Sequence, residues 1–256
     1  MKTLSLIGLG LSSERSIPLE GLDRLKVADV IFAEFFTSLL EKGTLGRLER
    51  LAGKNVILLN RKEVEEEEVV MESLKSNEKV CFLTAGDPLT ATTHQELRFD
   101  AMDRGICVEI IHSASIFNAA SGLAGLQHYK FGRTTTLAFP EGNYFPTSPL
   151  DIITENMERG LHTLVLLDIQ AERDRYMTAS EGCELLLRME AERGGGKISG
   201  RTKTVAVLRA GRVDRKVLYG ELGKLKGIDM GPPPHCLIIP GNLHFAEEEA
   251  LEHFRV

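Results

Sequence analysis

The sequence predicts an α/β protein whose first half alternates strands with helices. Short apolar runs recur along that half, the segments between them carry apolar residues three positions apart, and glycines or prolines punctuate the junctions. A series of strand and helix units of this kind favours a parallel or largely parallel sheet. The chain of 256 residues corresponds to one large or two medium domains.

Five apolar runs in the first half are expected to form strands. They cover residues 4–7, 29–33, 56–59, 80–84 and 107–111. Helices are expected between them: one that begins at Pro18, one that Gly53 closes, one at about 63–76 and one that ends near Gly105. The first two show leucines three positions apart, which places those leucines on one helical face.

Two of these helices carry polar signals at their starts. Thr93 and Glu96 fit a capping box ahead of the last helix of this half. Glu65 to Glu68 place four acids near the start of the helix at 63–76, where they suit the helix dipole. We interpret this acidic run as a solvated face and not as a metal or partner site.

Near residue 113 the composition changes, because small residues dominate from 113 to 125. We therefore predict an N-terminal α/β domain of residues 1–113 with a largely parallel sheet and a C-terminal mixed α/β domain of residues 114–256. Strands are expected there at 134–139, 163–167, 204–208, 216–219 and 235–239, and helices at 150–159, 179–192 and 246–254. The short consecutive strands late in the chain suggest an antiparallel component.

Composition and charge exclude several classes of protein. The 31 basic and 37 acidic residues give a net charge of −6, which argues against a nucleic-acid binder. No apolar run reaches the roughly 18–20 residues of a membrane span, and the N-terminus shows no signal-peptide pattern. The four cysteines have no Cys-x-x-Cys spacing and are interpreted as reduced thiols, which predicts a cytoplasmic protein. The histidines and cysteines show no ligand spacing, so no metal site is expected.

Glycine-rich and polar motifs follow several of the predicted strands. Gly8-Leu9-Gly10 follows the first strand, Gly86-Asp87-Pro88 the fourth, and the segment 112–116 the fifth. In open α/β sheets, ligands bind outside the carboxyl ends of the strands, so this placement favours function. Two further candidates are the Gly/Pro-rich loop 140–148 and the segment 231–235, whose prolines precede a histidine.

Each motif also has a plain structural interpretation, and the residues alone leave the choice open. The first glycine pair is a dinucleotide fingerprint, a bare tight turn or another ligand-binding turn. Ser13 replaces the third glycine of that fingerprint, and its acidic residue would be Glu34. Asp87 either binds a ligand or caps its turn. Ser115 either binds a ligand or caps a helix, and His235 is either a ligand or a core residue.

Several collinear motifs together resemble one enzyme family. They include Ile7-Gly8-Leu9-Gly10-Leu11, Ala33-Glu34-Phe35-Phe36-Thr37-Ser38, Gly86-Asp87-Pro88-Leu89, Pro140-Glu141-Gly142-Asn143 and Pro233-Pro234-His235. On these residues the chain resembles the archaeal diphthine synthases, methyltransferases of the diphthamide pathway, over nearly its whole length. Their broader relatives are the tetrapyrrole methylases. Those enzymes typically carry a longer Gly-x-Gly-x-Gly-Asp opening, and the first motif agrees instead with the diphthine branch.

The resemblance implies two unequal α/β domains of the tetrapyrrole-methylase type, with S-adenosylmethionine in the cleft between them, and a homodimer. The cofactor-binding positions of the family carry over to eight residues of this chain. They are Leu11, Asp87, Thr90, Ser115, Ile116, Leu167, Ala210 and His235. No catalytic base carries over, and the resemblance implies no metal.

The implied reaction transfers methyl groups from S-adenosylmethionine to the amino group of a 3-amino-3-carboxypropyl-histidine on translation elongation factor 2. The products are the trimethylated side chain, diphthine, and S-adenosylhomocysteine. One alternative is a tetrapyrrole or other small-molecule methyltransferase of the same fold. A second is a non-catalytic module that binds a translation factor or a nucleotide, and a third is a dinucleotide-dependent dehydrogenase.

Overall fold

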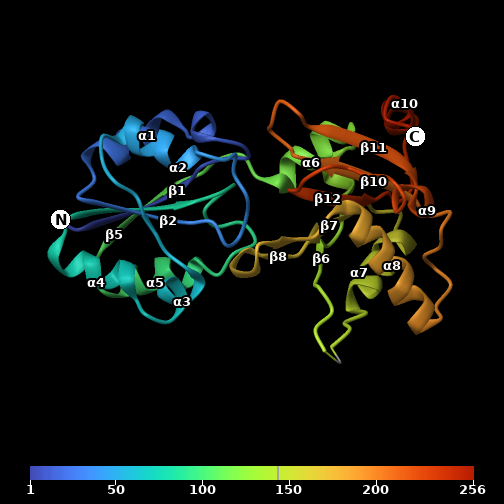
Figure 1. Ribbon diagram of the computed structural model, residues 1–256, viewed down its shortest axis with the longest axis horizontal. Coiled ribbons are helices and arrows are strands. Elements are labelled where there is room, and N and C mark those ends of the chain that lie inside the picture. Colours follow the sequence, from blue (N-terminus) through green and yellow to red (C-terminus); the bar gives the residue numbers. More distant parts are fainter. Residues whose placement is uncertain (143) are drawn as a thin grey trace. The chain divides into compact units, whose positions relative to one another are not determined.

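The computed structural model describes residues 1–142 and 144–256 (Figure 1). Within these ranges the chain divides into two compact units, Met1–Ile116 and Phe117–Val256, called unit 1 and unit 2 below. The division falls after residue 116, whereas the change of composition predicted a domain boundary after residue 113. None of the helices in the described residues is both long and apolar enough to span a bilayer.

Unit 1 is built on a five-stranded sheet with the strand order β3-β2-β4-β1-β5. The strands are β1 (Thr3–Gly8), β2 (Val30–Glu34), β3 (Ile57–Leu58), β4 (Lys79–Thr84) and β5 (Cys107–Ile111). Every neighbouring pair runs parallel, which confirms the parallel sheet that the sequence predicts. The apolar runs of the central strands β1, β2 and β4 suit this sheet because their side chains are buried on both faces, whereas Ile57 and Leu58 of the edge strand β3 are exposed.

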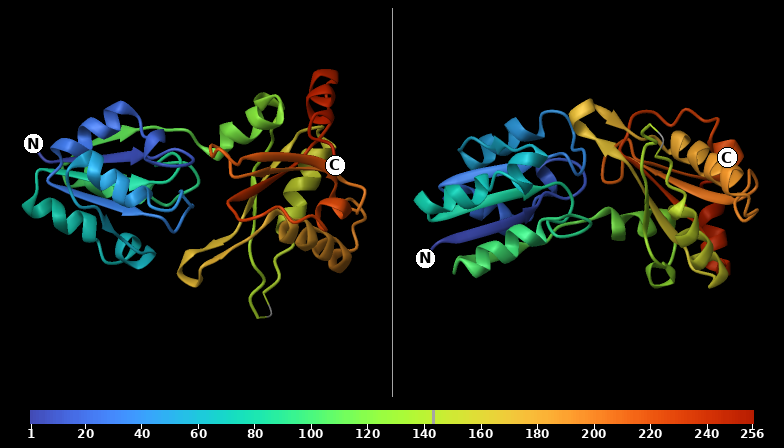
Figure 2. Two further views of the ribbon diagram at one scale, coloured as in Figure 1. Left: turned by 45° about the horizontal axis from the view of Figure 1, so that its top comes forward. Right: turned by 90° about the horizontal axis from the view of Figure 1, so that it is seen from below.

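The helices of unit 1 lie on the two faces of this sheet, as Figures 1 and 2 show. They are the 3-10 helix η1 (Glu14–Ser16), α1 (Leu19–Val27), α2 (Thr44–Ala52), α3 (Arg61–Glu65), α4 (Val69–Ser76) and α5 (Gln95–Asp103). Successive strand side chains point to opposite faces. Ile7 therefore packs in one core with Leu25 of α1 and Leu48 of α2. Its neighbour Leu6 packs in the other core with Leu74 of α4.

Two local predictions for unit 1 are wrong. The segment 63–76 forms two helices, because the chain breaks at Glu68, whose φ is +49°. Like charges three or four positions apart destabilise a helix, which fits a break inside the acidic run. Thr93 does not cap α5, since its hydroxyl donates to a carboxylate oxygen of Glu65 and the residue at the N-cap is His94.

Unit 2 contains a mixed five-stranded sheet with the order β11-β10-β12-β7-β6. The strands are β6 (Thr135–Leu137), β7 (Thr163–Leu167), β10 (Lys203–Leu208), β11 (Lys216–Glu221) and β12 (His235–Ile239). Only the β6–β7 pair is parallel, and the other three pairs are antiparallel, as the short late strands suggest. A separate hairpin joins β8 (Ile169–Gln170) to β9 (Arg175–Tyr176). These two strands are too short for a sequence pattern to reveal.

The helices of unit 2 also lie on two faces, with α7 and α8 on one side of the sheet and α6 and α10 on the other (Figures 1 and 2). The α-helices are α6 (Ile116–Ala124), α7 (Ser148–Glu158), α8 (Ala179–Arg193), α9 (Leu222–Leu225) and α10 (Phe245–Glu252), with 3-10 helices η2 (His128–Lys130) and η3 (Ala171–Arg173). Thr178 and Glu181 form a capping box at the start of α8. Gly182 in its first turns leaves room for Leu167, because a Cβ there would lie 2.8 Å from a Leu167 methyl group.

Candidate functional site

In unit 1 the chain segments that follow β1 and β4 are bonded to each other. The Gly10 amide donates to the Gly86 carbonyl at 3.1 Å, and the Gly86 amide donates back to Gly10 at 2.7 Å. The Leu9 amide donates to the Thr84 carbonyl at 2.8 Å. The carboxyl ends of the two neighbouring central strands are therefore fixed as one piece of backbone.

The glycines of the first motif are explained by this close approach. A Cβ on Gly8 would lie 2.5 Å from the Gly86 carbonyl oxygen and 2.8 Å from the Ser113 Cβ. Gly10 has a φ of +71°, which favours glycine, and a Cβ there would meet Ser16 at 2.7 Å. The structure thus gives both glycines a packing role within the chain, as the tight-turn interpretation requires.

Asp87 is the acceptor around which this edge of the sheet is organised. Its Oδ1 accepts hydrogen bonds from the Leu89 amide at 3.1 Å and the Thr90 hydroxyl at 3.0 Å. Its Oδ2 accepts from His112 Nδ1 at 2.7 Å and from the Ser113 amide at 3.3 Å. Burial works to raise the Asp87 pKa, but the hydrogen bonds, first that from His112, outweigh it and lower the pKa. Asp87 therefore holds its own turn together and ties it to the end of β5.

Five of the predicted cofactor positions belong to this edge of unit 1. Leu11 follows β1, Asp87 and Thr90 follow β4, and Ser115 and Ile116 follow β5. Since β4, β1 and β5 are adjacent in the sheet, these positions all follow the carboxyl ends of three neighbouring strands. This is the part of an open α/β sheet where ligands bind.

Sequence reasoning missed a buried polar pair beside the same edge. Glu34, at the end of β2, accepts hydrogen bonds from the Phe36 and Thr37 amides at 3.0 and 3.1 Å and from the Thr37 hydroxyl at 2.6 Å. Its carboxylate serves its own turn, so it does not fit the acid of a dinucleotide fingerprint. Burial raises the Glu34 pKa. His94 Nε2 lies 3.8 Å away, and burial lowers the His94 pKa to about 4, so its ring is neutral.

The three predicted positions of unit 2 also meet at one edge of a sheet. Leu208 of β10 pairs with His235 of β12, and Cys236 pairs with Leu166 of β7. Because β12 is antiparallel to both neighbours, its start lies beside their ends. Leu167, Ala210 and His235 therefore belong to the same edge, and all three are buried.

Arg209 joins the segments at this edge; it belongs to the motif Arg209-Ala210-Gly211 of the family resemblance, but its role was not predicted. Its backbone has a φ of +49°, in the left-handed region that only glycine adopts freely. One guanidinium nitrogen donates to the Met230 and Pro232 carbonyls at 2.9 and 2.8 Å. The guanidinium also pairs with Asp214 at 2.6 Å. The buried guanidinium thus connects the turn after β10 to the loop before β12.

His235 lies against this guanidinium and has a structural contact of its own. Its Nδ1 accepts a hydrogen bond from the amide of Ala179, the first residue of α8, at 3.1 Å. Arg209 Nη1 lies 3.1 Å from its Nε2. Burial, followed by the charge of Arg209, lowers the His235 pKa to about 4. A neutral ring that accepts at Nδ1 carries its proton on Nε2, so the contact with Arg209 is not a hydrogen bond to His235.

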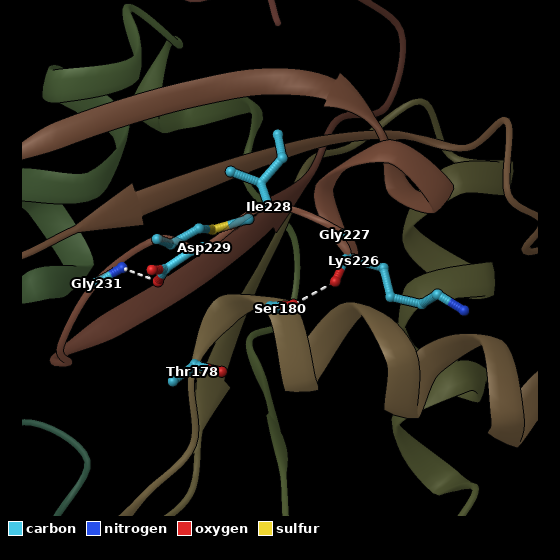
Figure 3. Close-up of a pocket in the computed structure, with 8 residues that line it drawn as sticks. Thr178, Ser180, Lys226, Gly227, Ile228, Asp229 and Gly231 are labelled. Carbon is cyan, nitrogen blue, oxygen red and sulfur yellow. Dashed lines mark hydrogen bonds between the residues drawn. The ribbon is translucent and has the colours of Figure 1, made fainter.

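A pocket of about 260 Å³ opens beside this edge, between the start of α8 and the loop that follows α9 (Figure 3). Thr178, the N-cap of α8, and Ser180 in its first turn line it on one side, and Asp229, Met230 and Gly231 line it from the loop. Asp229 accepts a hydrogen bond from the Gly231 amide at 2.9 Å, and the Ser180 hydroxyl donates to the Lys226 carbonyl. The pocket is smaller than those that usually enclose a whole cofactor-sized ligand, which start at roughly 300 Å³.

The loop 140–148 contains Asn143, which lies outside the described residues. On either side of it Glu141 and Tyr144 exchange backbone hydrogen bonds of 3.1 and 2.8 Å. Arg173, after β8, donates to the Glu141 carboxylate at 2.6 Å. Across the described ranges, no group of three or more His, Cys, Asp and Glu side chains is arranged to hold a metal ion.

Comparison with known proteins gives this arrangement a class. Residues 3–226 match the family of tetrapyrrole (corrin/porphyrin) methylases. The diphthine synthase of Methanococcus aeolicus is 46% identical, over 97% of this chain and 96% of its own. That of Methanothermobacter thermautotrophicus is 48% identical, over 97% and 94%. A crystal structure of diphthine synthase covers 99% of this chain and 96% of its own, with a TM-score of 0.89 and 33% identity.

The chain belongs to the tetrapyrrole methylase family, a class of methyltransferases. Within that family it belongs with the diphthine synthases, which confirms the resemblance drawn from the motifs. Membership implies a methyl donor of the S-adenosylmethionine type.

Proposed function

We propose that this protein binds S-adenosylmethionine and methylates the amino group of 3-amino-3-carboxypropyl-histidine on translation elongation factor 2. Three transfers give diphthine and three molecules of S-adenosylhomocysteine. The identity of 45–48% to diphthine synthases over nearly the whole chain supports the proposal most strongly. The gathering of the predicted cofactor positions at one sheet edge in each unit is the structural observation that agrees with it.

We propose that the eight positions hold the cofactor in two different ways. Asp87 already accepts four hydrogen bonds within unit 1, so it shapes the turn and leaves direct contacts to its neighbours. Leu167 and Ala210 offer a buried apolar lining that suits the uncharged parts of an adenosyl group. When bound, the cofactor supplies an electrophilic methyl group, and the protein must present the substrate amine to it in a reactive orientation.

We also propose that the protein works in the cytoplasm as a homodimer. The dimer rests on the resemblance to its family. The compartment rests on the cysteines: the four are free thiols, and burial raises the pKa of Cys81, Cys183 and Cys236 to about 12. Thiols of this kind are structural and belong to a reducing environment.

The test is the gain in mass of elongation factor 2 that carries the aminocarboxypropyl-histidine intermediate. With S-adenosylmethionine present, we expect a shift of about three methyl groups, and no shift when the target histidine is replaced. Binding of S-adenosylmethionine is measured in parallel by calorimetry. Cofactor binding without any mass gain would move the substrate to a small molecule, and absence of both would overturn the methyltransferase assignment of this chain.

A further inference from the structure

His112 and Asp87 form an acid–imidazole pair at the carboxyl edge of unit 1. His112 Nδ1 lies 2.7 Å from Asp87 Oδ2. Because the lowered pKa keeps Asp87 ionised, its carboxylate only accepts hydrogen bonds, so the imidazole carries a proton on Nδ1 and donates it to Asp87. The second nitrogen, Nε2, is then the basic one. The His112 side chain is 69% exposed, which leaves that nitrogen open to a substrate.

The position of the pair links it to the proposed cofactor contacts. His112 directly follows β5, and Ser115 and Ile116 come three and four residues later. Thr90 donates to the same carboxylate that orients His112. One acidic side chain thus fixes both the turn at the proposed cofactor positions and the direction of an imidazole beside them.

The other described histidines near the two proposed cofactor edges are not available for proton transfer. His94 is buried behind the unit 1 edge, and burial lowers its pKa to about 4. His235 is buried at the unit 2 edge, and its Nδ1 is occupied by the start of α8. His112 differs from both because its ring is exposed while one nitrogen is held by an acid.

Each methyl transfer of the proposed reaction needs a proton acceptor. An ammonium has no lone pair, so the substrate must lose one proton before the first transfer. Each of the next two transfers again starts from a protonated, partly methylated amine that must lose a proton. Three protons therefore leave the substrate for each diphthine made, and a base that can return protons to water serves all three.

We infer that His112 is the general base of this reaction, with Asp87 as its positioning residue. The N–H bond of the substrate ammonium breaks, its electron pair stays on the amine nitrogen, and the proton binds His112 Nε2. The resulting imidazolium is stabilised by the Asp87 carboxylate and releases its proton to water through its exposed ring. The inference rests on the proposed function, because it presupposes an amine substrate.

The sharpest variant is His112→Asn, because the asparagine amide can still donate to Asp87 where Nδ1 does, while no basic nitrogen remains. We expect single-turnover methylation of elongation factor 2 to slow about 100- to 10,000-fold, which is the usual contribution of a general base to the rate. Mass spectrometry should show all three transfers slowed. The affinity for S-adenosylmethionine, measured by calorimetry without substrate, should stay within about 3-fold, and the thermal unfolding of the variant should match that of the wild type.

A second variant, His112→Ala, opens space for an external base. We expect added imidazole to restore part of its rate, in proportion to the imidazole concentration, and to leave wild-type enzyme unchanged. Nitrogen NMR of the substrate-free enzyme at alkaline pH should show that the His112 proton lies on Nδ1. In Asp87→Asn the preference for this tautomer should change.

The outcomes separate this inference from the proposed function. If the wild type methylates the factor and His112→Asn does so at a similar rate, His112 is no base and the function stands. If His112→Asn loses cofactor affinity as strongly as rate, the residue binds the cofactor and the inference is overturned. If the wild type itself shows no methylation, the proposed function fails, and the inference fails with it.

Discussion

Each unit places a histidine beside a charged side chain at the edge of its sheet, and the two charges are opposite. In unit 1 the carboxylate of Asp87 accepts from His112, whose side chain is 69% exposed. In unit 2 the guanidinium of Arg209 lies 3.1 Å from His235, which is 8% exposed. The acid orients the exposed ring of His112 through a hydrogen bond, whereas burial and the neighbouring cation lower the pKa of His235 and keep that ring neutral. The same residue type is thereby suited to proton transfer in one unit and to structure in the other.

Asp87 and Arg209 also bind opposite kinds of groups, since one accepts hydrogen bonds and the other donates them. Asp87 accepts from two backbone amides, a hydroxyl and an imidazole. Arg209 donates to the carbonyls of Met230 and Pro232. A loop edge rich in free amides needs an anion, and one rich in free carbonyls needs a cation, because buried backbone groups must find partners. The three predictions below test each side of this comparison.

The largest effect is expected from Asp87→Ala. The change leaves four donors without their acceptor, and losing a buried charged partner costs about 3 to 5 kcal/mol. Since Asp87 is 9% exposed, we expect the free energy of unfolding at neutral pH to fall by about 3 kcal/mol. Denaturation by urea measures this loss. His112→Ala, which removes only one exposed donor, should cost less than about 1 kcal/mol.

Lowering the pH tests whether Asp87 stabilises the fold through its charge or through its packing. Its folded-state pKa is lowered, so the stability it contributes is present above the unfolded pKa of 3.8 and is lost as the pH falls through the folded value. The gap in stability between wild type and Asp87→Ala should therefore narrow in acid. A gap that stayed constant down to the lowest pH would mean that the carboxylate acts through packing alone.

An effect of similar size is expected from the titration of His235. Its folded-state pKa of about 4 lies below the ordinary value of 6.5, so between these two pH values the unfolded chain binds a proton that the folded chain does not bind. The stability held by the neutral ring is complete above pH 6.5 and is lost as the pH falls toward 4. The loss amounts to about 3 kcal/mol at the acid end, at roughly 1.4 kcal/mol for each pH unit.

His235→Asn isolates this contribution from the other acid-sensitive groups. The asparagine oxygen can accept the Ala179 amide where Nδ1 does, but it does not titrate. We expect the variant to be less stable than the wild type at neutral pH and to approach it as the pH is lowered. Parallel acid curves for the two proteins would show that His235 titrates normally and that Arg209 does not control it.

The strands were the most predictable part of the fold. In unit 1 the five apolar runs match β1 to β5 within one or two residues. The central strands β1, β2 and β4 need unbroken apolar segments because they are buried on both faces, although the edge strand β3 is exposed. In unit 2 the runs at 163–167 and 235–239 match β7 and β12 at both ends. The failures are local. The helix break at Glu68 fits repulsion within the acidic run, which the apolar periodicity does not reveal, and the hairpin of β8 and β9 is too short to leave a periodic signal.

The candidate site was predictable only where a residue type had few possible roles. The glycines at 8 and 10 were located from their place after a strand, but their reason, the approach of Gly86 and Ser113, involves segments far away in sequence. The role of Arg209 could not be predicted, since nothing near it in sequence reveals the carbonyls to which it donates. The pairing of His112 with Asp87 joins two strand ends 25 residues apart and likewise appears only in the fold.

The smallest effect is expected from Arg209→Met, which keeps much of the side-chain volume and removes the donors. Two carbonyls, the buried one of Met230 and the partly buried one of Pro232, lose their partner, and each such loss costs roughly 1 kcal/mol. We expect a fall of about 2 kcal/mol in the free energy of unfolding, measured by urea denaturation. Nitrogen NMR should at the same time show that the pKa of His235 rises, because the neighbouring cation is gone.

Arg209→Gly is the matched control, because it removes the same donors and also releases the backbone from its φ of +49°. If the guanidinium holds a strained backbone in place, the glycine variant should regain roughly 1 kcal/mol relative to the methionine variant, the usual cost of the left-handed region for a residue with a Cβ. Two equally unstable variants would mean that the backbone there is unstrained. A His235 that titrates as in the wild type in both variants would show that burial alone keeps it neutral, and the contrast between the two histidines would then rest on exposure and not on the opposite charges beside them.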